Sequence, residues 1–236
     1  VSRTPPWQMI NTMRFYRAAQ HDQWLPGRTP RAASVEVYGM KTIRIYRGQN
    51  WVALPFIPDS NCVKSILGYN LPGGTSYTHT NSTKAIWYNQ SPRQTPKTVL
   101  WLCKSAATNW IYQMGGTVGY TADYMSVSLS EGFVIQVPTN GPRGTNTLMF
   151  LGRVPTNTIN QSIMGFTTAA CYNVVSFRGP TRVHPSQMGL LSSGFHGSGD
   201  GNPLHGSRIW SLNRETQRGS AEAWYDNITS RWRLNQ

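Results

Sequence analysis

Apolar and polar residues alternate along most of this chain from Ser34 onward. Successive side chains of a β-strand point to opposite faces of a sheet, so a period of two indicates strands that bury one face. Clusters of proline, glycine and serine separate these runs and predict turns. The predicted strands lie within residues 35–38, 43–46, 50–56, 84–89, 99–103, 109–113, 124–129, 133–137 and 147–154.

Helical periodicity is rare in the same sequence. Val63–Leu67 is predicted to form one short helical turn between strands. Residues 7–20 carry apolar side chains at helical spacing, yet an extended strand through residues 9–16 fits them nearly as well. The chain is therefore predicted to be all-β.

An internal repeat organises the predicted strands. Three tryptophans recur downstream at a nearly constant offset of 123 residues, and the same offset pairs Gly74 with Gly197. The pairs are Trp87 with Trp210, Trp101 with Trp224 and, after one deleted residue, Trp110 with Trp232. Self-similarity at a fixed period is the signature of repeated modules. We therefore predict two tandem antiparallel β-sandwich or β-barrel modules.

The predicted modules differ in completeness. The sequence is divided into an N-terminal arm (1–34), β module 1 (35–138), a linker and strand (139–162) and β module 2 (163–236). The first module continues from Trp110 to Pro138, whereas only residues 233–236 follow Trp232. The second module is therefore predicted to be shortened at its C-terminal end.

The arm contains apolar residues that belong to neither repeat. They are Trp7, Met9, Ile10, Met13, Phe15 and Tyr16. A module that lacks its final strands would expose unpaired backbone groups along a strand edge. We predict that the arm of one subunit adds to the open edge of the next subunit's second module, head to tail. Two alternatives are that the arm folds back onto its own chain and that the chain is a proteolytic product.

The order of motifs also carries a resemblance. Repeat one contains VEVYG at 35–39, NWVALPF at 50–56, LPGGTS at 71–76, IWYN at 86–89 and LSEGFVIQVP at 129–138. This order resembles secreted tandem-repeat β proteins of Verrucomicrobia and Planctomycetes, whose modules open with a Val-Tyr-Gly strand and close with a Glu-Gly-Phe strand. The resemblance covers about residues 35–236, and Ser130 departs from it where the group has Gly or Pro. It implies an extracellular or cell-surface location and no known chemistry.

The charge and hydropathy of the chain limit the kinds of partner that it is expected to bind. The chain has 22 Lys and Arg against 9 Asp and Glu, a net charge of +13. The basic residues are scattered singly and do not form the polybasic run of a packaging arm, so nucleic acid is disfavoured as a partner and an acidic polysaccharide remains an option. No apolar run is long enough to span a membrane. The chain does not begin with Met, and we expect it to start after processing.

Catalytic and metal-binding patterns are weak. The nine acidic residues do not pair in a motif, and the histidines lack metal-ligand spacing. His196, Asp200 and His205 lie in a glycine-rich stretch that indicates a polar turn rather than a metal site. We predict no catalytic centre, no metal and no cofactor.

The roles of the cysteines and of the tryptophans can each be interpreted in two ways. Cys62 and Cys103 could form a disulfide in an oxidising compartment, or they could be small buried apolar residues. The tryptophans could form an exposed platform for sugars, or they could fill the core, and core packing is favoured for Trp87 and Trp101. The candidate platform consists of Trp87, Trp101, Trp110, Trp210, Trp224 and Trp232.

Three functions fit these patterns. The first is a structural extracellular protein, a self-assembling subunit of a surface filament or sheath that polymerises with itself. The second is a carbohydrate-binding cell-surface module, and the third is the capsid protein of a small virus. A filament subunit needs a way to join its ends, and the arm together with the incomplete second module offers one.

Overall fold

The structure is a computed structural model of the chain, and most of what it describes is β-sheet. It describes residues 13–16, 19–20, 32–33, 36–75, 81–89, 95–112, 119–128, 132–139, 146–155, 173, 184–213 and 218–235. One α-helix and several sheets occur in these residues, which confirms the predicted all-β class. The chain divides into two compact units, Val1–Pro180 and Thr181–Gln236. The internal repeat predicted an earlier start of the second module, at Ile163.

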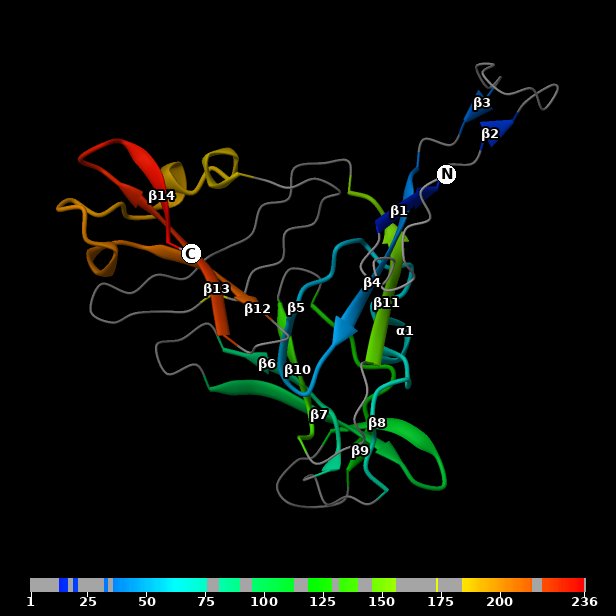
Figure 1. The fold of residues 1–236 in the computed structure, drawn as a ribbon. Helices are drawn as coiled ribbons and strands as arrows, with labels where there is room; N and C mark the ends of the chain where they lie inside the picture. The colour runs from blue at the N-terminus through cyan, green and yellow to red at the C-terminus, as the bar shows by residue number, and fades with distance from the viewer. Residues whose placement is uncertain are drawn as a thin grey trace, which may run out of the picture. The chain divides into compact units, whose positions relative to one another are not determined.

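A three-stranded antiparallel sheet forms one layer of the first unit. Its order is β1-β4-β11, with β1 at Met13–Tyr16, β4 at Tyr38–Ile45 and β11 at Asn146–Arg153 (Figure 1). A separate two-stranded sheet joins β2 (Ala19–Gln20) to β3 (Ala32–Ala33). The predicted alternation holds in β4 and β11, where Ile43, Ile45 and Phe150 are buried between more exposed neighbours.

A six-stranded antiparallel sheet forms the rest of the first unit. Its order is β5-β10-β6-β7-β8-β9. The strands are β5 (Gly48–Val52), β10 (Phe133–Val137), β6 (Lys84–Tyr88), β7 (Pro96–Lys104), β8 (Thr108–Tyr112) and β9 (Tyr120–Thr121). One face of this sheet contributes Trp87, Leu102, Trp110 and Phe133 to a core that also contains Phe150 of β11. The two sheets therefore share one hydrophobic core.

Helix α1 spans Val63–Leu67, the predicted helical turn. Its buried residues Val63, Ile66 and Leu67 recur at the spacing that places side chains on one helical face. The next residue, Gly68, accepts a hydrogen bond from Trp110 Nε1 at 2.8 Å. This contact ties the end of the helix to the central strands.

The predicted strand at 124–129 is not formed over its described residues. Tyr124 lies in a turn, and Ser126 makes only an isolated bridge to Cys62. The backbone N–H groups of Val63 and Lys64 donate to the carbonyls of Met125 and Asp123. Segment 122–127 is thus used to cap the start of α1, and its alternating sequence does not extend a sheet.

The second unit contains a smaller antiparallel sheet. Its strands are β12 (Arg208–Asn213), β13 (Arg218–Asp226) and β14 (Arg231–Asn235), in the order β12-β13-β14. Three short 3-10 helices precede it: η3 (Pro185–Gln187), η4 (Leu191–Ser193) and η5 (Pro203–His205). On one face, the Trp232 ring packs against Phe195 and Tyr225 at centroid distances of 5.3 and 5.6 Å.

The β12-β13-β14 sheet has the same hydrogen-bond pattern as β6-β7-β8. Lys84 opposite Trp101 corresponds to Arg208 opposite Trp224. In both sheets a β-bulge follows, between Trp87 and Tyr88 in one and between Ser211 and Leu212 in the other. The third strands match as well, because Leu102 lies opposite Trp110 and Tyr225 lies opposite Trp232.

The preceding loop is shared too. A parallel bridge joins Gly74 to Cys103 in the first unit and Ser198 to Asp226 in the second. A Cβ on Gly73 would lie 2.6 Å from the Lys104 side chain, and a Cβ on Gly197 would lie 2.3 Å from that of Asn227. Because Lys104 and Asn227 follow these bridges in the same way, only glycine fits at both positions. The similarity covers the loop and the three strands; two complete modules remain a prediction.

Part of the N-terminal arm belongs to the first unit. Met13, Phe15 and Tyr16 lie in β1, where Met13 pairs with Lys41 and Tyr16 with Tyr38 of β4. Over these four residues the arm folds back onto its own chain, one of the two alternatives left open by the sequence. Trp7, Met9 and Ile10 lie outside the described residues.

Candidate functional site

The six candidate platform tryptophans do not form one exposed surface. Three are buried and serve as packing residues, and Trp101 and Trp232 are half-buried. The buried ones are Trp87, 5 % exposed, Trp110, 0 % exposed, and Trp224, 7 % exposed. Trp87 stacks on Phe133 at a centroid distance of 5.0 Å. Only Trp210 among the six is strongly exposed, at 47 %.

A one-residue shift explains why Trp210 differs from Trp87. On the matched hydrogen-bond pattern the offset is 124 residues for β12, 123 for β13 and 122 for β14. Trp210 therefore occupies the position of Ile86, although the sequence alignment pairs it with Trp87. Shifting a strand by one residue turns every side chain to the other face. Trp210 consequently lies on the same face as Trp224, whereas Trp87 and Trp101 lie on opposite faces.

Trp210 is held in place by two side chains on its own face. Its Nε1 donates to Glu222 Oε1 at 2.9 Å, and Glu222 lies directly opposite on β13. The Arg208 guanidinium stacks on the indole, 4.6 Å from the ring centroid, and donates to the same carboxylate oxygen at 2.9 Å. The result is a Trp210 cluster of one exposed indole, one guanidinium and one carboxylate with fixed relative positions.

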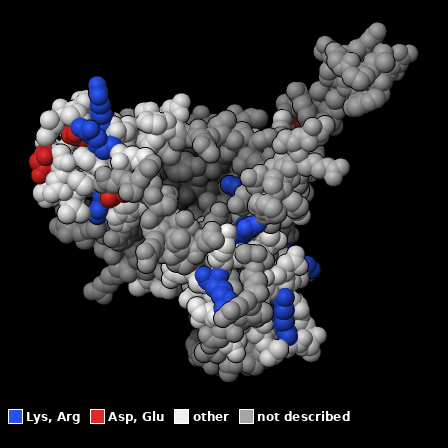
Figure 2. Space-filling model, in the orientation of Figure 1, with Lys and Arg blue, Asp and Glu red and all other residues white. Residues whose placement is uncertain are grey.

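The same face continues with charged residues across β13 and β14. Arg233 lies opposite Trp224, and its guanidinium pairs with Asp226 at 3.2 Å. Arg231 lies opposite Asp226. Hydrogen bonds from Thr229, then Arg233 and the Ile228 backbone, lower the pKa of Asp226, so that this carboxylate stays charged. Figure 2 shows basic and acidic side chains together on the second unit and single basic side chains elsewhere on the face in view.

Two strands of the second unit lack a described neighbour that their counterparts in the first unit have. In the first unit β6 has β10 on its outer side, with Ile86 opposite Val134, and β8 has β9, with Ile111 opposite Thr121. In the part of the chain that the structure describes, no strand lies beyond β12 or β14. Unpaired N–H and C=O groups along such an edge can pair with another strand.

The glycine-rich stretch near His196 forms a polar turn, as the sequence indicated. Asp200 accepts from Ser198 Oγ at 2.8 Å, from the Asn202 N–H at 3.0 Å and from His205 Nδ1 at 2.7 Å. Ser198 and His205 both bind this carboxylate. In nucleophilic catalysis the serine hydroxyl instead bonds directly to the histidine. The turn instead fixes Ser198, which bridges to β13.

Acid is expected to weaken this turn. The Asn202 backbone, His205 and Ser198 lower the pKa of Asp200 from 3.8 to about 2, so the carboxylate stabilises the fold above pH 3.8 and loses this contribution as pH falls toward 2. We expect the stability difference between the native chain and Asp200→Asn to shrink as the pH falls from 3.8 toward 2 and to vanish well below pH 2, in thermal melts across the acidic pH range. An Asp200 carboxyl that titrates near 3.8 by NMR would contradict this assignment.

Cys62 and Cys103 are free thiols, so the disulfide considered from the sequence is not formed. Cys62 precedes α1, and its sulfur lies 3.3 Å from Ser60 Oγ and 3.1 Å from Ser65 Oγ. These hydroxyls lower the pKa of the Cys62 thiol. Cys103 is buried in β7, which agrees with the alternative of a small apolar residue for this position.

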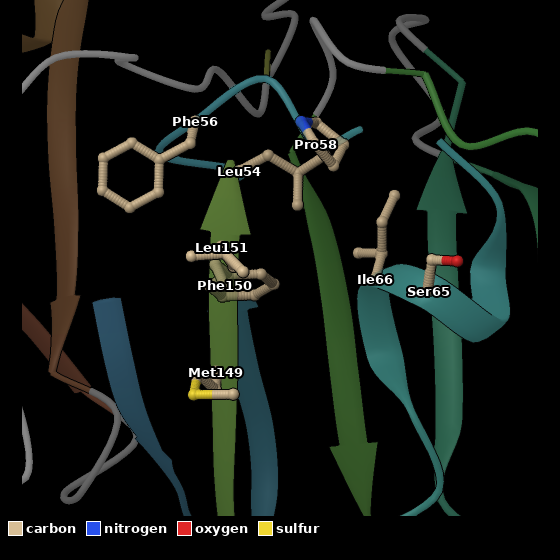
Figure 3. A pocket seen from close by; sticks show the side chains of 8 residues that line it. All are labelled: Leu54, Phe56, Pro58, Ser65, Ile66, Met149, Phe150 and Leu151. Atoms are coloured by element: carbon tan, nitrogen blue, oxygen red, sulfur yellow. The ribbon is translucent and has the colours of Figure 1, made fainter. Parts of the chain in front are cut away.

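An apolar pocket lies between β11, α1 and segment 54–58 (Figure 3). Its lining residues are Leu54, Phe56, Pro58, Ser65, Ile66, Met149, Phe150 and Leu151. Its empty volume of about 250 Å³ includes space that is open to solvent. Sites for small molecules contain several convergent polar groups. The side chains that line this pocket carry one hydroxyl, that of Ser65, so it does not define a ligand site.

Among the described residues, no helix is long and apolar enough to cross a membrane. No group of three His, Cys, Asp or Glu side chains in the same residues could hold a metal ion. Comparison with known proteins finds no matching family model, no similar curated protein and no similar solved structure.

Proposed function

We propose that this chain is a structural, self-assembling protein of an extracellular surface, whose subunits join by β-strand addition of the N-terminal arm to the second unit of a neighbour. The outer edge of β12 supports this proposal. Its counterpart β6 has β10 as a partner, whereas β12 has no described partner on that side. Composition and the resemblance of the motif order support the extracellular setting.

The donor in this proposal is the arm segment before β1. Residues 13–16 already pair with β4, which shows that this part of the chain can form an edge strand. Three apolar residues precede it, Trp7, Met9 and Ile10. Trp7 and Met9 are two positions apart, and Ile10 is next to Met9. A strand that continues outward from β1 could therefore pair with β12 of another subunit while β1 stays in its own sheet. The contact is heterologous and gives an open polymer.

Removal of residues 1–12 tests this arrangement, because β1 and the described core remain. We expect the full chain to form filaments by electron microscopy and large species by analytical ultracentrifugation, and the shortened chain to be monomeric with an unchanged midpoint of thermal unfolding. Ile10→Lys should also prevent assembly, because a charge would replace an apolar anchor. Leu204→Lys is the matched control at an exposed apolar position of η5, 68 % exposed, and should assemble normally.

Filaments that persist after the deletion would reject the arm as donor. A full chain that stays monomeric at concentrations of about 100 μM would reject self-assembly by this contact, since the corresponding free energy would be weaker than about −5.5 kcal/mol.

A further inference from the structure

We propose that the Trp210 cluster binds a pyranose ring of an acidic polysaccharide, with the sugar stacked on the exposed part of the indole and its anionic neighbour near the arginines of β14. This site does not depend on self-assembly. Contacts with neighbouring side chains orient Trp210, polar groups lie beside its ring, and charged residues share its sheet face.

The exposed indole is pre-organised. Arg208 covers one side of the ring, and the hydrogen bond from Nε1 to Glu222 prevents rotation about the side-chain bonds. Trp210 nevertheless stays 47 % exposed, so part of the indole remains accessible to a ligand. A rigid aromatic surface loses little conformational entropy on binding, so more of the contact energy contributes to affinity.

The chemistry around the indole suits a sugar. The face of an aromatic ring carries partial negative charge, which attracts the C–H groups on one side of a pyranose. Hydroxyl groups at the ring edge need both donors and acceptors. Arg208 supplies guanidinium N–H groups and Glu222 supplies carboxylate oxygens next to the ring, and each of these groups can take part in several hydrogen bonds.

The charges favour an acidic chain over a neutral one. Among the described side chains of this face, Arg208, Arg231 and Arg233 accompany two carboxylates, those of Glu222 and Asp226, which is an excess of one positive charge. Neighbouring strands lie about 4.8 Å apart, so β14 is about 10 Å from β12. That span is close to the length of two linked sugars, so a carboxylate on the second sugar can reach Arg231 or Arg233.

Single-stranded nucleic acid is the competing ligand, since bases also stack on tryptophan. Two observations favour the polysaccharide. Glu222 and Asp226 lie on the binding face, where their oxygens can accept hydrogen bonds from the many hydroxyl groups of a sugar chain. On the face shown in Figure 2, the basic side chains of the described residues are also dispersed and do not form a continuous track.

Titration of the full chain with polygalacturonate, cellohexaose and oligothymidylate tests the site, with binding followed by calorimetry. We expect polygalacturonate to bind, Trp210→Ala to weaken that binding about tenfold or more, and Trp210→Phe to retain part of it. Arg231→Gln should weaken binding of polygalacturonate several-fold and leave that of cellohexaose unchanged. Leu234→Ala is the control, because Leu234 is 57 % exposed and lies opposite Ala223, on the other face of the sheet.

Three results would overturn the proposal. They are equal affinities of the native chain and Trp210→Ala, tighter binding of oligothymidylate than of polygalacturonate at about 0.15 M salt, and no binding of either polysaccharide at millimolar sugar. Far-UV spectra and thermal melts of each variant show whether lost binding comes from lost folding, since the Trp210 side chain is exposed and its removal should leave the sheet intact.

Discussion

Replacement of Trp110 by alanine is expected to destabilise the first unit by about 3 to 5 kcal/mol. The Trp110 side chain is completely buried, and it belongs to the core formed by the six-stranded sheet. Its Nε1 also donates to the Gly68 carbonyl at 2.8 Å. The substitution would leave a large cavity and remove the hydrogen bond that ties α1 to β8. Denaturant unfolding, with hydrogen exchange of the Leu102 and Ile135 amides as a probe of this unit, measures the effect.

Trp210→Ala is the matched control for the same change of residue type. Trp210 is half exposed, so we expect a loss of about 1 kcal/mol or less, from the contacts with Arg208 and Glu222. Trp110→Phe should fall between the two, because it preserves most of the core volume but not the hydrogen bond. Equal destabilisation by the two alanine substitutions would show that burial does not separate these tryptophans as described.

Strand positions could be predicted because burial of one face imposes a period of two. The runs at 84–89 and 133–137 correspond to β6 and β10, and Val63–Leu67 correctly stood out as helical. The predicted strand at 124–129 is wrong because the alternating pattern does not reveal hydrogen bonds to distant backbone. Met125 and Asp123 use their carbonyls to cap α1, and this depends on tertiary structure.

The tryptophan repeat predicted a similarity but not the face of each side chain. Trp101 and Trp224 do occupy equivalent positions on their central strands. Trp87 and Trp210 do not, because the offset changes by one residue between neighbouring strands. A gap-free alignment of this stretch cannot distinguish the two registers, yet a single residue decides whether a tryptophan is in the core or on the surface. The Trp210 cluster could therefore be found only from the strand register.

The pairing of the arm depended on information that the sequence did not contain. The pattern of residues 7–20 fitted a helix or a strand through residues 9–16 nearly equally well. The predicted partner of the arm was a neighbouring subunit, and folding back onto the same chain was the alternative. The structure pairs these residues with β4. For the segment before them, addition to a neighbouring subunit remains our proposal.

Removal of the Asp123 carboxylate is expected to have the second large effect, a loss of about 2 to 6 kcal/mol from Asp123→Ala. Asp123 is 4 % exposed, and its two oxygens accept from the Trp110 N–H and the Tyr69 hydroxyl. Each donor would lose its partner inside the protein, at a cost of about 1 to 3 kcal/mol. Because the Asp123 backbone also contacts Lys64, the substitution should loosen α1 together with β8.

The tyrosine provides a spectroscopic test of the same contact. Burial, together with the hydrogen bond to Asp123, raises the pKa of Tyr69 to about 12. Asp123→Asn keeps an oxygen that can accept from the Trp110 N–H and removes the negative charge. We therefore expect this variant to lose less stability than Asp123→Ala and to show a lower Tyr69 pKa in an ultraviolet titration, with Tyr69→Phe identifying the signal. Unchanged titration of Tyr69 in Asp123→Asn, or equal stability of Asp123→Ala and the native chain, would mean that this carboxylate does not hold the helix and the strand together.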